Sequence, residues 1–210
     1  MAVKNVNPTR MELTKLKRKL VSAVRGHKLL KDKRDELMRQ FMELVQINRR
    51  LRERVEKGIS SANKNFARAR AVMQDETINT AFLAPKQEVY LDVGKKNVMS
   101  VEVPVLDFQR ESQEDEGSIF PYGFLQSSSE LDDAIEKLYH MMPKLLQLAE
   151  TEKTCQLMAD EIEKTRRRVN ALEHRTSPDL EDTIYYIEMK LDEHERSTII
   201  RLIKVKDLHL

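Results

Sequence analysis

Apolar residues recur with helical spacing from Pro8 and Thr9 to about Ala81, and this stretch contains no further proline and only two glycines. Two rows of positions seven residues apart form the pattern of a heptad repeat. The first row is Leu13, Leu20, His27, Arg34, Phe41, Asn48 and Val55, and the second is Leu16, Ala23, Leu30, Leu37, Leu44 and Leu51. A sustained heptad repeat winds two helices into a left-handed coil, so residues 1–81 are predicted to form the first coiled-coil helix.

The apolar stripe changes phase beyond Gly58. It continues at Ile59, Ala62, Phe66, Ala69 and Met73. The change equals a four-residue insertion, which locally unwinds a supercoil. With a rise of about 1.5 Å per residue, the whole predicted helix would be roughly 110 Å long.

Three polar residues, His27, Arg34 and Asn48, occupy seam positions of this helix. A polar group at such a position lowers stability and tends to fix the register and the partner of a coil. We therefore interpret these three as coil-register residues, and contact with a surrounding chain remains the alternative.

A second helical stretch, residues 129–210, follows Ser127, Ser128 and Ser129. Its stripe is Leu131, Ile135, Leu138, Met142, Leu145, Leu148, Cys155, Ala159, Ile162, Val169, Leu172, Leu180, Ile184, Ile187 and Leu191. Pro143 and Pro178 interrupt it, so we expect a kink near each, or a fresh helix start with Ser177 as the cap and Pro178 as the first helical residue.

The connector, residues 82–128, contains the sequence pattern of a β-hairpin over about residues 88–105. Val89, Leu91 and Val93 alternate with other residues, Gly94 to Asn97 is the predicted turn, and Met99, Val101, Val103 and Val105 alternate again. A lone two-stranded hairpin is marginal in water, so it must pack on the helices or on another subunit. The predicted fold is mainly α: a long antiparallel two-helix coiled-coil hairpin with a small central β-hairpin.

Composition narrows the possible partners. The 37 basic and 35 acidic residues nearly cancel, and the formal charge of +2 is too small to favour nucleic acid or an anionic membrane as the main partner. No apolar run approaches the ~20 residues that cross a bilayer, so direct membrane insertion is not expected. A single cysteine and the absence of a signal sequence indicate a reducing, cytoplasmic setting.

The sequence offers no candidate for catalysis. It lacks the phosphate-binding pattern G-x-x-x-x-G-K-[ST], and Cys155 lies on the apolar stripe, where a small buried thiol is common. No histidine pairs with another histidine or with Cys155 at metal-ligand spacing. The five histidines are His27, His140, His174, His194 and His209. We expect no cofactor, metal or catalytic residue.

Two segments carry a resemblance to a known family. The first segment is Asn7-Pro8-Thr9-Arg10 followed by Leu13, Leu16-Lys17, Leu20, the run from Gly26 to Asp35, and Leu37. The second segment is the run from Arg167 to His174, then Pro178, the run from Leu180 to Ile184, Tyr186-Ile187 and the run from Leu191 to Arg196. Together with the hairpin, they resemble the D subunit, the central rotor stalk of V-type and A-type ATPases. Arg175, Thr176 and Ser177 depart from the aliphatic residue that the family often has before the proline.

The resemblance implies a non-catalytic shaft that couples ATP hydrolysis or synthesis to the rotation driving proton or sodium transport. The implied partners are the catalytic A and regulatory B subunits of the ring, the small F subunit and a subunit connecting to the membrane rotor, on the cytoplasmic face of a membrane. Candidate ring contacts are Arg166, Arg167, Arg168, Ile199, Ile200, Leu202 and Ile203. Candidate small-subunit contacts are Val89, Leu91, Val93, Met99, Val101 and Val103. By composition alone the three arginines would be a solvated helix face.

The alternative from another class is a chaperone or adaptor of the prefoldin kind, which also combines helical hairpins with a β-hairpin. The length of the predicted helices argues against it, because they exceed what such a chaperone needs.

Overall fold

The computed structural model describes residues 6–83, 87–112, 119–123 and 127–208. Parts of the predicted connector, residues 84–86, 113–118 and 124–126, lie outside this range. The chain divides into two compact units. Unit 1 comprises Met1–Leu37 with Ile162–Leu210, and unit 2 comprises Met38–Glu161.

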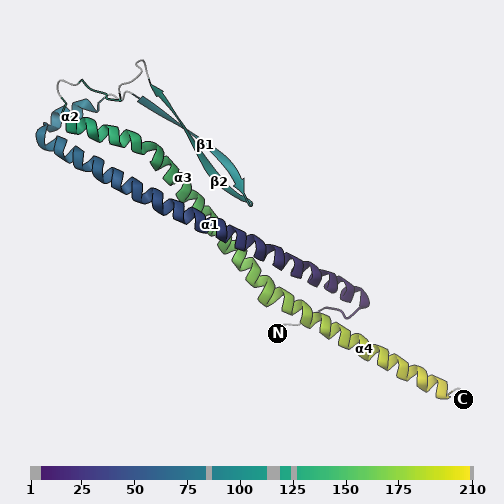
Figure 1. Ribbon diagram of the computed structural model, residues 1–210. Helices are drawn as coiled ribbons and strands as arrows, with labels where there is room; N and C mark the ends of the chain where they lie inside the picture. The colour runs from purple at the N-terminus through teal and green to yellow at the C-terminus, as the bar shows by residue number, and fades with distance from the viewer. Residues whose placement is uncertain (1–5, 84–86, 113–118, 124–126, 209–210) are drawn as a thin grey trace. The chain divides into compact units, whose positions relative to one another are not determined.

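The elements follow one another as the sequence predicts for a helical hairpin (Figure 1). Their order is α1 (Arg10–Val72), α2 (Asp75–Ala81), β1 (Gln87–Val98), β2 (Val101–Ser112), α3 (Ser129–Ala171), the π-helical turn η1 (Leu172–Thr176) and α4 (Ser177–Leu208). The strands form a two-stranded antiparallel sheet. The predicted mainly α fold with a central β-hairpin is confirmed.

The first helix ends earlier than its apolar pattern suggests. Gln74 has an extended backbone, with φ −71° and ψ 141°, and separates α1 from the seven-residue helix α2. The sequence holds no proline or glycine at this point, so nothing in the apolar spacing reveals the break.

The beginning of α1 explains the Asn-Pro-Thr-Arg segment. The hydroxyl of Thr9 accepts a hydrogen bond from the Glu12 amide at 3.3 Å, and the Thr9 carbonyl accepts one from Leu13 at 3.0 Å. Thr9 is therefore the N-cap, and it satisfies amide groups that the first helical turn leaves free. Val6, which precedes the cap, packs against the core of unit 1.

Unit 1 pairs the first part of α1 with α4 in antiparallel fashion. Its core cluster consists of Leu16, Leu180, Ile184 and Ile187, of which Ile187 is fully buried. Lys17 contacts Glu188 at 2.7 Å, and seven residues earlier Arg10 pairs with Glu195, seven residues later on α4. Side-chain pairs that step in opposite directions along two helices require an antiparallel arrangement.

Unit 2 pairs the remainder of α1 with α3, again antiparallel. Arg52 lies 3.9 Å from Glu152, and Ser61 accepts a hydrogen bond of 3.2 Å from Lys137. Between these contacts the helices approach closely, because a Cβ atom on Gly58 would lie 1.6 Å from Cε of Met141. Small residues continue the seam, with Ala62 and Ala69 fully buried. The phase shift predicted at Gly58 therefore coincides with a close helix contact.

The predicted seam of α1 is confirmed throughout, since every residue of both heptad rows is buried or half-buried. The prediction for α3 is wrong at Leu138, Met142 and Ala159, which are exposed. Their places in the core are taken by Ala134, Met141 and Met158. Met141 and Met158 each lie one residue before the predicted position, which corresponds to a rotation of about 100° on a helix, whereas Ala134 lies about one turn before Leu138. The burial of Met141 depends on its contact with Gly58, which sequence spacing on one helix cannot reveal.

The turn of the hairpin was predicted at Gly94 to Asn97, and this prediction is wrong. Those residues belong to β1, and Val98 pairs with Val101 across a two-residue turn formed by Met99 and Ser100. Both turn residues have positive φ, 51° and 72°. The Ser100 amide donates a hydrogen bond of 2.9 Å to the side-chain oxygen of Asn97. A two-residue turn of this kind favours Asn-Gly, so Met-Ser gives no turn signal in the sequence.

The second long helical stretch does not restart at Pro178. Ser177 has right-handed helical angles, and its amide donates a hydrogen bond to the Leu172 carbonyl, so the helix continues through it. The five-residue π-helical turn η1 instead joins α3 to α4, and Pro143 lies inside α3 without ending it. Among the described residues, no helix combines the length and the apolar character needed to span a membrane.

Candidate partner-binding surfaces

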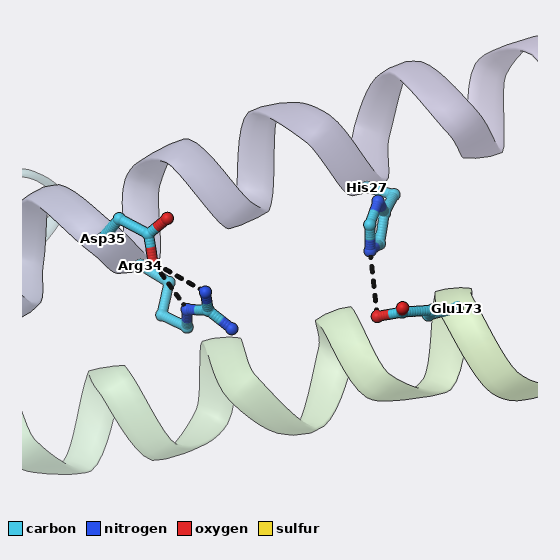
Figure 2. A network of polar contacts seen from close by, with 4 residues as sticks. All are labelled: His27, Arg34, Asp35 and Glu173. Atoms are coloured by element: carbon cyan, nitrogen blue, oxygen red, sulfur yellow. Dashed lines mark hydrogen bonds and ion pairs between the residues drawn. The ribbon is translucent and has the colours of Figure 1, made fainter.

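Two of the three coil-register residues form polar contacts within unit 1 (Figure 2). The Nε2 atom of His27 on α1 lies 3.3 Å from a carboxylate oxygen of Glu173 on η1, so this pair bridges the two helices. Nε and Nη2 of Arg34 donate to Asp35, the next residue of the same helix, at 3.0 and 2.7 Å. The His27 contact therefore depends on how the two helices are aligned. The described contacts of Arg34 lie within its own helix and do not depend on that alignment.

The third residue, Asn48, contacts the thiol of Cys155 across the seam of unit 2. Burial raises the pKa of Cys155, and the hydrogen bond from Asn48 partly offsets that increase. The side-chain oxygen of Asn48 is buried and has no hydrogen-bond partner among the described residues. A raised pKa keeps the thiol protonated and poorly nucleophilic, which fits a packing role for Cys155.

The basic cluster Arg166, Arg167 and Arg168 lies on the exposed side of α3. Arg167 pairs with Glu163 on its own helix. The neighbouring residues Thr165 and Val169 are 1% and 2% exposed and belong to the seam. The seam thus fixes the orientation of α3 and directs the arginines outward, where a partner could contact them.

The end of α4 presents a concentration of exposed apolar residues. Ile199, Ile200, Leu202 and Ile203 are between 48% and 64% exposed. They follow Glu195, whose partner Arg10 is the first residue of α1. Every described residue from Thr198 onward is exposed, so no described part of the chain covers this end.

The hairpin divides the candidate small-subunit contacts into two groups. Val89, Leu91 and Val93 of β1 are 42%, 47% and 58% exposed, whereas Val101 and Val103 of β2 are buried. Met99, in the turn, is half-buried. Only the β1 residues and part of Met99 are therefore available to a partner when the hairpin is in this position.

The buried part of the hairpin packs on the helices of unit 2. A groove of about 360 Å³ separates Val98, Val103 and Val105 of the hairpin from Leu44 and Ile47 of α1 and from Thr151 and Met158 of α3. This arrangement satisfies the expectation that a two-stranded hairpin needs support.

The sequence prediction missed two members of the exposed hairpin face. Leu106 pairs with Val93 and Phe108 pairs with Leu91, and both are half-buried. They lie on the same face as the β1 valines, because residues directly opposite each other in an antiparallel pair point to one side. The apolar alternation of Val101, Val103 and Val105 ends at Asp107, and Leu106 and Phe108 begin a second alternation on the other face of the strand. This second pair is the signal that would have extended the predicted strand.

These surfaces have the chemistry of binding. The described residues include no group of three or more His, Cys, Asp or Glu side chains that could hold a metal ion. Exposed apolar side chains on a rigid ribbon and on a helix end are instead the features by which proteins associate. Fold and surfaces define the class as a coiled-coil protein that works through binding partners.

Comparisons with known proteins identify the family. The family model for the ATP synthase D subunit matches residues 12–207. The V-type ATP synthase D subunit of Clostridium botulinum strain ATCC 19397 / Type A is 61% identical over 204 residues, which cover 97% of this chain and 94% of the relative. The D subunits of C. botulinum strain Alaska E43 / Type E3 and Clostridium novyi strain NT are 59% and 60% identical over 208 residues, 99% of this chain and 98% and 96% of theirs. The chain belongs to the ATP synthase D subunit family.

Proposed function

We propose that the chain is the central rotor shaft of a V-type or A-type ATPase. It couples ATP hydrolysis or synthesis in a ring of A and B subunits to the rotation that drives proton or sodium transport. The shaft is non-catalytic, binds the small F subunit and a connecting subunit of the membrane rotor, and lies on the cytoplasmic face of the membrane. Membership of the D subunit family is the observation that carries this proposal.

The packing of the helices supports a mechanical role. A shaft must resist twisting, and interlocked side chains along a helix pair provide that resistance. Both units contain such packing, around Ile184 and Ile187 in unit 1 and around Ala62 and Ala69 in unit 2. Each half of the helical pairing can therefore transmit torque.

The exposed charges support free rotation. Several of the described ion pairs join side chains that are well exposed, such as Arg49 with Glu53 and Arg39 with Glu43. Exposed pairs contribute only about 0–1 kcal/mol each. A surface of this kind can exchange contacts with successive neighbours without holding the shaft at one angle.

The partner surfaces are assigned as follows in this proposal. The arginine cluster and the apolar end of α4 contact the ring, and Val89, Leu91 and Val93 of β1 contact the small F subunit. Burial of Val101 and Val103 against unit 2 orients the hairpin so that the opposite face is open. No observation favours a prefoldin-like chaperone over this function.

Copurification of the full chain with coexpressed A, B and F subunits tests the proposal. We expect a stable complex containing all four proteins, and failure to form it would count heavily against a rotor shaft.

Replacing Arg166, Arg167 and Arg168 with Ala should weaken the association with the ring. The matched control replaces Arg49, Arg50 and Arg52, which are also exposed, and should have a smaller effect.

Thermal unfolding of the free chain separates binding from stability. If the Arg166–168 variant destabilises the free chain while its affinity for the ring stays unchanged, the cluster is structural.

For the small F subunit, Leu91→Ser with Val93→Ser should reduce the copurification of that subunit with the chain. Asp92→Ser, on the same strand but the opposite face, is the control.

A further inference from the structure

The packing of unit 1 is not uniform along its length. No residue of α1 between Leu16 and Leu37 is buried, and no residue between Val169 and Leu180 is buried on the facing chain. The residues at both ends of these intervals are at most 5% exposed. The two intervals face each other around His27, which contacts Glu173. The beginning of the α1 interval, with Leu20 and Ala23, packs instead against the core cluster of unit 1. A loosely packed stretch therefore separates two tightly packed ones.

The π-helical turn lies within this loose stretch, and its hydrogen bonds differ from those of an α-helix. The Ser177 amide donates to the Leu172 carbonyl, five residues back, and the Thr176 hydroxyl donates to the Ala171 carbonyl at 3.2 Å. Pro178 has no amide hydrogen, so it cannot donate to the His174 carbonyl. Thr176 and Pro178 are thus the sequence features that favour a wide turn at this place.

The wide turn amounts to one extra residue in the helix. Such insertions occur mostly as single turns within α-helices and often at functional sites. Val169 and Leu180, on its two sides, are both buried. Their spacing of eleven residues is about three turns of regular α-helix, so the seam itself does not require the extra residue. The five residues of η1 have no buried side chain.

We infer that η1, with the facing His27 region of α1, is a compliant segment in which twisting of the helix pair is concentrated. Resistance to twist comes from interlocked side chains, and here the seam is half-buried and includes a polar pair, His27 with Glu173. A role of this segment under torque rests on the proposed rotor function. The low local stability of the segment does not depend on that function, so it can be tested on the free chain.

Hydrogen exchange of the full chain, followed by mass spectrometry, tests the softness directly. Regions with few buried contacts open locally at lower cost than the core. Amides of residues 172–180 should exchange at least tenfold faster than those of residues 183–191. Equal protection in the two segments would overturn the inference, whether or not the chain binds an ATPase ring.

Restoring the missing backbone donor tests the wide turn. Pro178→Ala supplies an amide that can donate to the His174 carbonyl, so it should favour regular α-helix through η1. Val169 and Leu180 stay on one face of such a helix, and exchange of this segment should slow at least threefold. Glu181→Ala, at an exposed position that already has its amide, is the control and should leave exchange unchanged. Equal exchange in Pro178→Ala and the unaltered chain would show that the wide turn is not the cause of the softness.

A substitution that keeps the chain length provides an independent measurement. His27→Leu places an apolar side chain on the seam beside η1 and should slow exchange of residues 172–180. Lys28→Leu adds the same side chain at the neighbouring exposed position and should leave exchange unchanged. If both variants have the same effect, or neither has any, seam packing does not control the compliance of this segment.

Discussion

The seam of unit 1 and the β1 strand of the hairpin are both rich in branched apolar residues, but they differ in how far these side chains are buried. Ile187 on the seam is fully buried, whereas Val93 on β1 is 58% exposed. The seam meets a second helix of the same chain, while the open face of β1 meets no described part of it. Apolar character alone therefore does not distinguish a residue that stabilises the fold from one that is available to a partner. The distinction comes from what the chain itself covers.

The largest effect is expected at the centre of the seam. Ile187→Ala removes buried methyl and methylene groups and leaves a cavity, so it should lower the free energy of unfolding by about 2–5 kcal/mol. Denaturant unfolding of the free chain measures the loss. Tyr185→Ala is the control, because Tyr185 is two residues away and 67% exposed, and its effect should stay within about 0.5 kcal/mol. Similar losses would contradict the assignment of Ile187 to the core.

The same comparison can be made within the hairpin. Val103→Ala removes two buried carbons that face the groove of unit 2 and should cost about 2 kcal/mol, while Val93→Ala should cost little. Hydrogen exchange of the strand amides measures the stability of the hairpin itself. If Val93→Ala accelerates exchange as much as Val103→Ala, the two faces of the hairpin are not distinct in stability.

How far the sequence predicts these differences depends on the element. The heptad rows of α1 identified its seam residues, including polar His27 and Asn48, because a coil buries positions at a fixed period. The exposure of β1 and the burial of Val103 could not be predicted, since alternation gives the two faces of a strand without showing which one meets the helices. On α3 the same limit appears at Met141, whose burial depends on Gly58 of another helix.

The polar surfaces follow the same rule. Arg166, Arg167 and Arg168 were identified as a basic cluster from sequence, and their exposure follows from the burial of Thr165 and Val169.

The π-helical turn η1 was not predicted from the sequence. Pro178 indicated an irregular point, but a helix can respond to proline by a cap, a kink or a widened turn, and the choice depends on alignment with α1.

A smaller effect, of opposite sign, is expected at the hairpin turn. Met99 and Ser100 both have positive φ, which is unfavourable for residues other than glycine and, to a lesser degree, asparagine. Replacing them with Asn and Gly should stabilise the hairpin by about 1 kcal/mol and slow exchange of its amides. The same change in reverse order, Gly-Asn, is a suitable control for composition. A loss of stability in the Asn-Gly variant would mean that contacts of Met99 outweigh the strain of the turn.

The smallest effect concerns the exposed edge of the seam, where ion pairs repeat at heptad spacing. Arg10 pairs with Glu195 and Lys17 with Glu188, and the next step in both directions places Val24 opposite Glu181. Val24 is 54% exposed, so a charged side chain can replace it without leaving a cavity. Val24→Lys should therefore add a third pair.

An exposed pair of this kind is worth about 0.2–1 kcal/mol, so the comparison must be made against neutral and opposite charges at the same position. Val24→Lys should be more stable than Val24→Gln, and Val24→Glu should be less stable than both, because it places a carboxylate near Glu181. The differences should shrink as salt is added, since exposed charges are screened. If Val24→Lys and Val24→Glu have the same stability, residue 24 does not lie near Glu181. The register of the first two ion pairs would then not extend to this position.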